Sequence, residues 1–411
     1  MTSADEVFLI RGRGRVSALG WRPVPDAPAV SPFTAHSSGL VVAALPAAAE
    51  TAVAELRRSQ PAYRQLDRTV LLALLAARQA AAEAGWPATA AEAAAAVSAL
   101  TSHFSPLPLA VSIGSSRGAT GRLEAFHTEF LADGTVPAAA SPLTTLGNVA
   151  SWVAFDAGAA GGAALSHSST CSSAFQALGN AVAWLRAGMA TRFLAGGTEA
   201  PLTDFTLAQM RALGIYSPFP AAEWPCRPGA GRPSTFVLGE GAAVFALEKV
   251  GREQLEHEPM AGPRFVLEAV GFGFEAIASK TGLSSDGQHF QQAIRQALTQ
   301  AGRTPHDVDA VVLHSPGTPA GDAAERAALR AVFGAELPPL LSNKWLLGHT
   351  LGASGALSLD FALHVLETQQ WPAAPFTTDL APGSSRPIQR VLVNAAGFGG
   401  NAASVLVSRL L

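Results

Sequence analysis

Cysteine and lysine are scarce in this chain of 411 residues. Two cysteines in a chain of this length do not make a disulfide framework, so we expect a reducing compartment. Charged residues make up only 14% of the chain and the formal net charge is −3, whereas a nucleic-acid-binding protein normally shows a basic excess. Arginine carries almost all of the positive charge, because the only lysines are Lys249, Lys280 and Lys344.

Long apolar runs are also lacking. The nearest candidate, residues 152–165, is short, rich in alanine and glycine, and interrupted by Asp156, so we do not expect it to span a bilayer. The first seven residues contain Asp5 and Glu6 and have no signal-peptide pattern. We therefore expect a cytoplasmic protein. Apolar residues reach 48%, which is enough for a large core and for an oligomer interface.

Short apolar runs alternate with segments of helical periodicity, and this alternation predicts α/β layers. Leu66, Val70 and Leu74, for example, recur at helical spacing. Gly12 and Gly14 are expected to end the first strand. We predict strands at residues 7–10, 107–113, 192–195, 242–247, 264–270 and 310–313, with a final pair near 391 and 405. We predict helices at 66–84, 171–185, 290–301 and 323–333, with another starting near 349.

The sequence contains a faint internal echo. Thr170-Cys171-Ser172-Ser173-Ala174 opens one apolar helix, and the segment from His349 to Ala356 opens another. Two reactive side chains at the starts of two buried helices suggest two related halves that face one site. Chance in an alanine-rich chain explains the echo equally well.

Cys171 is the candidate nucleophile because it precedes a predicted helix. The positive end of the helix dipole favours a thiolate. The alternative is a small buried apolar residue, which is what most lone cysteines are. Cys226 lies in a loop with no base nearby in the sequence, so we assign it a structural role.

Two of the ten histidines stand in settings that suit an active site. His314 ends a predicted buried strand and enters a loop of small residues. His349 lies among glycines, which let a ligand come close. A structural role is the alternative for each. Histidines, cysteines and acidic residues do not occur at metal-ligand spacing, so we predict no metal.

Two glycine-rich loops are also candidates. Residues 397–401 form a turn between two predicted strands, which can present backbone N–H groups to an anion, with Phe398 as its only bulky side chain. Residues 114–118 fit the pattern G-x-S-x-G of a hydrolase nucleophile elbow, with Ser116 as the nucleophile. Gly121 in the following segment makes a poor elbow helix, so the serine hydrolase remains a remote alternative.

Taken together, these segments resemble the β-ketoacyl-acyl-carrier-protein synthases of the thiolase superfamily, of the elongating fatty-acid and polyketide type. The resemblance covers nearly the whole chain. It rests on Gly12 to Gly20, Leu66 to Arg68, Thr170 to Ser173, Gly196 to Glu199, Cys226 to Pro228, Gly239 to Ala242, His314 to Glu325, Lys344 to Gly355 and Gly397 to Gly400. It implies a thiolase-like α/β fold of two related halves, residues 1–258 and 259–411, in a five-layered αβαβα arrangement.

The resemblance also implies roles for individual residues. Cys171 would take an acyl chain from an acyl carrier protein, and the neutral imidazoles of His314 and His349 would stabilise the enolate formed when malonyl thioester loses CO₂. Lys344, held by Glu325, would keep a neighbouring histidine neutral. Other residues would shape the substrate site. Phe398 would act as a gate and, with Cys171, would form the oxyanion hole, with Gly399 beside it. Thr318 would bind the pantetheine arm, and Phe236 would line the malonyl side. Claisen condensation of this kind needs no cofactor beyond the carrier's phosphopantetheine arm.

The sequence departs from the family pattern in four places. Ser315-Pro316 replaces Gly-Thr, so carrier-arm binding must differ. Arg117 stands where relatives place a small apolar residue at the floor of the acyl pocket, or it points into a dimer interface. Residues 233–235 replace Arg-Asp-Gly, and Asn401 replaces threonine. We therefore expect a specialised acyl chain, such as an aryl polyene or another polyketide.

The expected partners are an acyl carrier protein and a second ketosynthase-like subunit, either another copy or an inactive paralogue. The carrier is acidic, and Arg64, Arg68 and Arg211 match family positions near the pocket mouth. A thiolase would carry a second reactive cysteine, and an initiating synthase would carry asparagine at His349. The alternative to a condensing enzyme is a non-catalytic chain-length or scaffold subunit, whose site would be idle because of Pro316 and Arg117.

Overall fold

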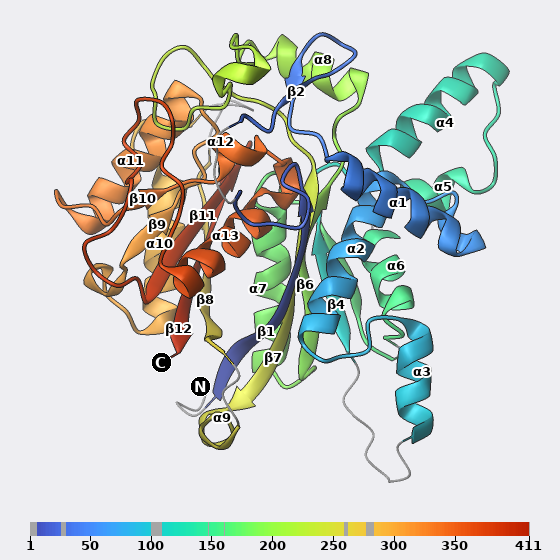
Figure 1. Ribbon diagram of the computed structural model, residues 1–411, viewed down its shortest axis with the longest axis horizontal. Coiled ribbons are helices and arrows are strands. Elements are labelled where there is room, and N and C mark those ends of the chain that lie inside the picture. The colour runs from blue at the N-terminus through green and yellow to red at the C-terminus, as the bar shows by residue number, and fades with distance from the viewer. Residues whose placement is uncertain are drawn as a thin grey trace.

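A single ten-stranded sheet runs through the protein. The computed structural model describes residues 6–25, 30–99, 109–146, 148–159, 161–258, 262–276 and 283–410 (Figure 1). The strands follow the order β10-β9-β11-β12-β8-β1-β7-β6-β4-β5. Their bounds are β1 Glu6–Ser17, β4 Ala110–Gly114, β5 Ala164–His167, β6 Arg192–Glu199, β7 Gly241–Gly251, β8 Arg264–Phe274, β9 Ala310–Val312, β10 Leu340–Leu341, β11 Arg390–Gly397 and β12 Asn401–Leu410. A separate small sheet pairs β2 (Thr34–Ala35) with β3 (Val41–Val42).

The ten strands form two copies of one five-stranded pattern. The order β5-β4-β6-β7-β1 repeats as β10-β9-β11-β12-β8. In each copy the second strand, β4 or β9, has parallel neighbours on both sides, and the remaining pairs are antiparallel. The copies join where β1 meets β8 over two residue pairs. This repeated topology favours two related halves over chance as the origin of the sequence echo.

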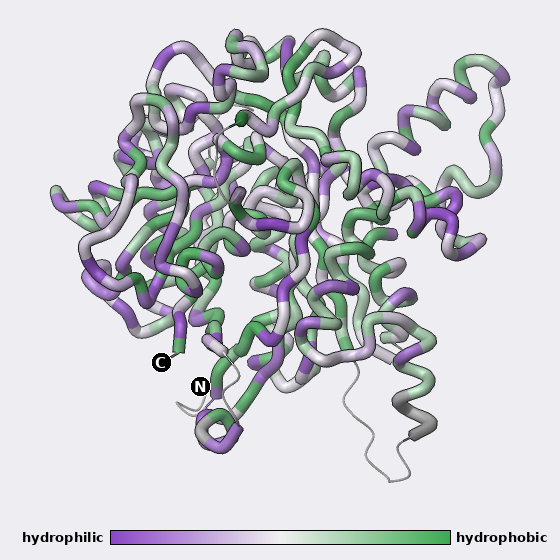
Figure 2. The backbone as a smooth tube through the Cα atoms, viewed as in Figure 1, coloured by the Kyte–Doolittle hydropathy of each residue, from purple (hydrophilic) through white to green (hydrophobic). Residues whose placement is uncertain are grey.

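Helices complete the predicted five-layered arrangement, which is confirmed. α2 (Arg68–Glu83) covers the outer face of the first half-sheet, and α10 (Gln288–Ala301) and α11 (Pro319–Phe333) cover the second. α7 (Ser173–Arg186) and α13 (Ser354–Thr368) lie between the half-sheets, since α7 packs on β4, β6 and β8 (Figure 1). Figure 2 shows hydrophobic residues concentrated in the strands and these inner helices. This packing places the starts of α7 and α13 in the interior.

Eight further helices are found in the described residues, and one of them, α12, is fully buried. They are α1 (Ala47–Ser59), α3 (Ala90–Ala99), α4 (Thr120–Asp133), α5 (Ala140–Thr144), α6 (Asn148–Asp156), α8 (Asp204–Ala212), α9 (Arg252–His257) and α12 (Lys344–Leu347). α4 and α5 project from the body (Figure 1), and Leu123, Phe130 and Leu131 on α4 are exposed. Among the described residues, the helices are too short or too polar to cross a membrane.

Three sequence expectations about elements were wrong. Gly12 and Gly14 do not end the first strand, because they lie inside β1 where α2 packs closely. A Cβ atom at Gly14 would lie 1.9 Å from the carbonyl oxygen of Ala76. Gly121 does not prevent a helix, since α4 starts at Thr120. The helix near His349 starts only at Ser354, after a short 3₁₀ turn. Residues 107 and 108 of the predicted strand lie outside the described residues.

Candidate active site

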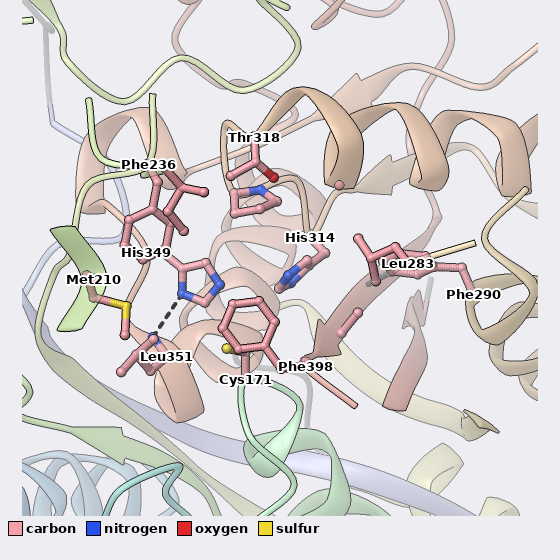
Figure 3. A pocket seen from close by; sticks show the side chains of 15 residues that line it. Cys171, Met210, Phe236, Leu283, Phe290, His314, Thr318, His349, Leu351 and Phe398 are labelled. Carbon is pink, nitrogen blue, oxygen red and sulfur yellow. Dashed lines mark hydrogen bonds between the residues drawn. The ribbon is translucent and has the colours of Figure 1, made fainter. Parts of the chain in front are cut away.

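The two inner helices bring distant residues to one cavity. Cys171 lies two residues before the start of α7, His349 lies five residues before the start of α13, and His314 follows β9. α7 and α13 occupy equivalent positions in the two halves, so their starts face the same space. All three side chains line a cavity of about 80 Å³ (Figure 3). The convergence of Cys171, His314 and His349 agrees with the sequence prediction for the site.

Cys171 is held by a strained segment. Thr170 has a φ of 50°, a conformation that non-glycine residues rarely adopt. Gly397 of β11 packs on this segment, and a Cβ atom there would lie 1.7 Å from Oγ1 of Thr170. Burial raises the pKa of the Cys171 thiol to about 12, and the nearby Lys344 lowers it only in part. The expected resting thiolate was therefore wrong, because burial outweighs the helix start, and the thiol needs a base.

His349 has a fixed tautomer. The backbone N–H of Leu351 donates to Nδ1 of His349 at 3.0 Å, so the proton of the neutral ring lies on Nε2 (Figure 3). Leu351 itself has a φ of 42°. Burial and the positive charge of Lys344 lower the pKa of His349 to about 3. His349 is therefore a neutral hydrogen-bond donor toward the cavity.

His314 is neutral as well, but its tautomer is not fixed. Its ring lies 5.2 Å from that of His349, nearly perpendicular. Burial, followed by the charge of Lys344, lowers the pKa of His314 well below its ordinary value. Among the described residues, its buried Nδ1 has no hydrogen-bond partner, and because the ring lines the cavity, Nε2 is the atom left for chemistry. His314 can accept or donate a proton there.

Lys344 is a buried cation behind the two imidazoles. Its Nζ donates to the carbonyl oxygen of Leu313 at 3.2 Å. Burial lowers its pKa to about 8, while the charge of Glu325 acts in the opposite direction. The implied direct ion pair between Lys344 and Glu325 is not found in the described part of the chain, because Glu325 is occupied by other donors.

Glu325 holds the loop that carries His314. Its carboxylate accepts the backbone N–H groups of His314 and Ser315, each at 2.8 Å. It also accepts the Ser315 hydroxyl at 2.7 Å and the Asn394 side-chain amide at 3.0 Å. Glu325 is therefore a positioning residue for His314.

Glu199 holds the loop after β4 in the same way, by accepting backbone hydrogen bonds. It accepts the backbone N–H groups of Ser116, Arg117 and Gly352. Ser116 has no hydrogen bond to a histidine among the described residues, so the serine hydrolase has no structural support. The Arg117 side chain binds Gln209 at 2.7 Å and does not line the cavity.

The predicted substrate residues gather at the cavity. Phe236, Thr318 and Phe398 line it, and the Phe398 ring lies beside Cys171 (Figure 3). Phe398 is 43% exposed, which suits a gate, and Gly399 has a φ of 85°. The sequence did not single out several apolar lining residues, because their helical or loop settings resemble ordinary core. They are Met210, Ile215, Leu283, Phe290 and Leu351.

The three arginines expected to dock the carrier differ in their surroundings. Arg64 and Arg211 are exposed. Arg68 forms ion pairs with Glu240 at 2.7 Å and Glu50 at 2.5 Å. Arg68 is therefore paired within the chain and Arg64 and Arg211 are the more available cations, while a docking role for Arg68 stays a prediction.

Comparison with known proteins shows the family. Residues 43–252 match the model for the beta-ketoacyl synthase N-terminal domain, and residues 265–376 match that for its C-terminal domain. The chain belongs to the β-ketoacyl synthase family. A polyketide beta-ketoacyl synthase of Streptomyces cyaneus is 33% identical over 331 residues, which are 74% of this chain and 76% of that protein. A 3-oxoacyl-[acyl-carrier-protein] synthase 2 of Staphylococcus aureus is 29% identical, over 73% of this chain and 75% of that protein.

Solved structures share the fold. The ishigamide ketosynthase/chain length factor superposes with a TM-score of 0.81 at 20% identity, covering 98% of this chain and 99% of that chain. A beta-ketoacyl synthase from Burkholderia phymatum STM815 gives 0.79 at 24% identity, covering 99% and 100%. These similarities establish a ketosynthase fold of the thiolase type.

Proposed function

We propose that this protein is a condensing β-ketoacyl-acyl-carrier-protein synthase. The observation that supports the proposal most is the convergence of Cys171, His314 and His349 on one cavity. A thiol and two neutral imidazoles are the groups that decarboxylative Claisen condensation requires. A non-catalytic subunit would have no need of this combination.

The first step is acyl transfer. Neutral His314 takes the proton of Cys171 as the sulfur attacks the acyl thioester, because a thiol with a pKa of about 12 is not ionised at neutral pH. The backbone N–H groups of Cys171 and Phe398 stabilise the tetrahedral oxyanion. The proton then passes to the departing carrier thiolate, so this step consumes no proton overall.

The second step is decarboxylation and condensation. Malonyl thioester loses CO₂, and the developing enolate oxygen accepts hydrogen bonds from Nε2 of His349 and from His314. Both rings are neutral, so neither gives the enolate a full proton before it reacts. The enolate carbon then attacks the acyl carbonyl on Cys171 and gives the 3-oxoacyl carrier and the free enzyme.

The substrate is a specialised chain carried on an acyl carrier protein, with an aryl polyene or another polyketide as the expected class. The similarity to a polyketide synthase of Streptomyces cyaneus supports this choice. Pro316 supports it too, because it lines the cavity where relatives carry a threonine hydroxyl. Arg64 and Arg211 are the exposed cations proposed to meet the acidic carrier.

A non-catalytic chain-length subunit is the second candidate. It is favoured by the similarity to solved structures of a ketosynthase with its chain length factor, such as ApeO with ApeC from Xenorhabdus doucetiae. In either case we propose a two-subunit assembly with a second copy or a paralogue. The intact set of Cys171 and both histidines in this chain favours the catalytic subunit.

Release of CO₂ from malonyl carrier separates the two candidates. The condensing enzyme should release CO₂ and form 3-oxoacyl carrier, and His314→Ala should lower the rate about 100-fold or more. His364→Gln, a change of a histidine outside the cavity, is the control. Release that is absent, or equal in both variants, would support the chain-length subunit.

A further inference from the structure

A third buried imidazole lies close to the site, next to the cavity-lining Phe290. His289 of α10 is fully buried, and its Nδ1 lies 3.2 Å from Oε2 of Glu275. The Ser284 hydroxyl donates to the same carboxylate oxygen at 2.7 Å. The side chain of Glu275 is 13% exposed, so this buried pair has an end near solvent.

Phe290 contacts both His289 and His314. The ring of Phe290, which lines the cavity, lies 4.6 Å from the ring of His289 and 6.2 Å from that of His314. Among the described residues, Nε2 of His289 and Nδ1 of His314 are both buried without a hydrogen-bond partner. The two rings are not hydrogen-bonded to each other directly, so a connection between these two buried nitrogens has to run through water.

The condensation step consumes one proton in the cavity, at the sulfur of Cys171. An acyl group on Cys171 and a malonyl carboxylate react to give 3-oxoacyl carrier, CO₂ and a cysteine thiolate. At neutral pH that thiolate takes up one proton, because burial holds the thiol pKa near 12. The acyl-transfer step has no such demand. His314 and His349 are buried and neutral, so the proton has to be delivered to the cavity.

We propose that Glu275 and His289 form a proton relay that delivers this proton to Nδ1 of His314, while Nε2 of His314 gives a proton to the Cys171 thiolate. The proposal rests on the condensing function proposed above. After each transfer the His314 ring is again neutral, with its proton on the other nitrogen. His289 accepts a proton on Nδ1 from the Glu275 side, is briefly an imidazolium, and returns to the neutral form when its Nε2 proton passes on toward His314.

The charges around His289 suit a transient imidazolium. Burial lowers the pKa of His289, whereas Glu275 in direct contact raises it, as do Glu325 and Asp286 at longer range. Three carboxylates therefore stabilise the positive charge that the relay creates for a moment. Glu275 is also anchored beside the Phe398 turn, because its backbone N–H donates to the carbonyl oxygen of Gly400 at 2.9 Å.

The test compares the two half-reactions in His289→Ala and Glu275→Gln. Acylation of Cys171 by acyl carrier should stay within about two-fold of the unaltered chain, because that step needs no external proton. Formation of 3-oxoacyl carrier and free thiol from the acylated enzyme should slow about ten-fold or more. Added imidazole should restore part of this rate in His289→Ala. Glu129→Gln, a change of an exposed acid on α4 that does not act on His289, is the control.

The outcomes separate this inference from the function on which it rests. If the unaltered chain never acylates Cys171 or never releases CO₂, the proposed function fails. If the unaltered chain condenses and both variants condense equally fast, the relay alone is wrong. Equal slowing of both half-reactions without rescue by imidazole shows a structural role and also overturns the relay. Glu275→Gln can still hydrogen-bond to His289, so it provides the comparison if His289→Ala does not fold.

Discussion

The pKa of each reacting side chain depends on burial and on one cation, Lys344. Its charge lowers the pKa of His314 and of His349 and also that of Cys171. The sequence motifs were enough to predict which residues meet. They did not predict that Cys171 rests as a thiol, because burial of its sulfur depends on β11 and on the Phe398 turn more than 200 residues away in the chain.

Removal of the Lys344 charge should shift the pH profile of catalysis. In Lys344→Met the pKa of both imidazoles rises, so each becomes protonated at a higher pH than before. Since the active rings are neutral, the acidic limb of the pH profile for CO₂ release should move up by about one unit. Lys249→Met, which breaks a surface ion pair with Glu6, is the control. An unmoved acidic limb would show that Lys344 does not tune the histidines.

A single glycine of β11 keeps the nucleophile in place. A Cβ atom at Gly397 would lie 1.7 Å from Oγ1 of Thr170 and 2.9 Å from the backbone nitrogen of Cys171. Gly397→Ala should therefore displace the oxyanion hole and lower the rate of Cys171 acylation about 100-fold. The free energy of unfolding should also fall, by about 1–3 kcal/mol, so acylation is measured well below the Tm of the variant. Gly383→Ala, at a site with no atoms within 4 Å, should acylate normally. Normal acylation of Gly397→Ala would contradict this account of the strained segment.

At the scale of elements, α2 packs closely on β1 at Gly12 and Gly14, the two glycines that we expected to end the strand. The apolar pattern predicted the helix and the strand but not how close they lie, because that distance depends on tertiary packing. Gly14→Ala should lower the free energy of unfolding by about 2–3 kcal/mol. The measurement is denaturant unfolding. Gly251→Ala, with no atoms within 4 Å of the added Cβ, should stay within about 0.5 kcal/mol. Equal stability of the two variants would contradict the close packing.

The repeated strand order explains why the site could be predicted at all. The segments of Cys171 and His349 open equivalent helices in two halves, so the faint sequence echo reflects a real topological repeat. The cavity wall was less predictable. Phe290 and Leu351 look like ordinary core positions in the sequence, and only the meeting of the two half-sheets brings them to the site.

At the scale of the whole molecule, a free surface arginine and an ion-paired arginine should give opposite results. Arg211→Glu should weaken acylation by acyl carrier, most clearly at low salt, and leave stability unchanged. Arg68→Met should instead lower the free energy of unfolding by about 3 kcal/mol, because it leaves the buried Glu240 without its partner. Arg330→Glu, on an exposed part of α11, is the control for carrier binding. Carrier-dependent acylation that ignores Arg211→Glu would place the docking surface elsewhere.

The claim on which the whole account depends is that Cys171 carries the acyl chain. The most direct measurement is the intact mass of the protein after incubation with acyl carrier protein loaded with an acyl group, followed by mapping of the modified peptide. The account predicts a mass increase of one acyl group on the peptide that contains Cys171, absent in Cys171→Ala. An unmodified chain, or an acyl group on another residue, would contradict it.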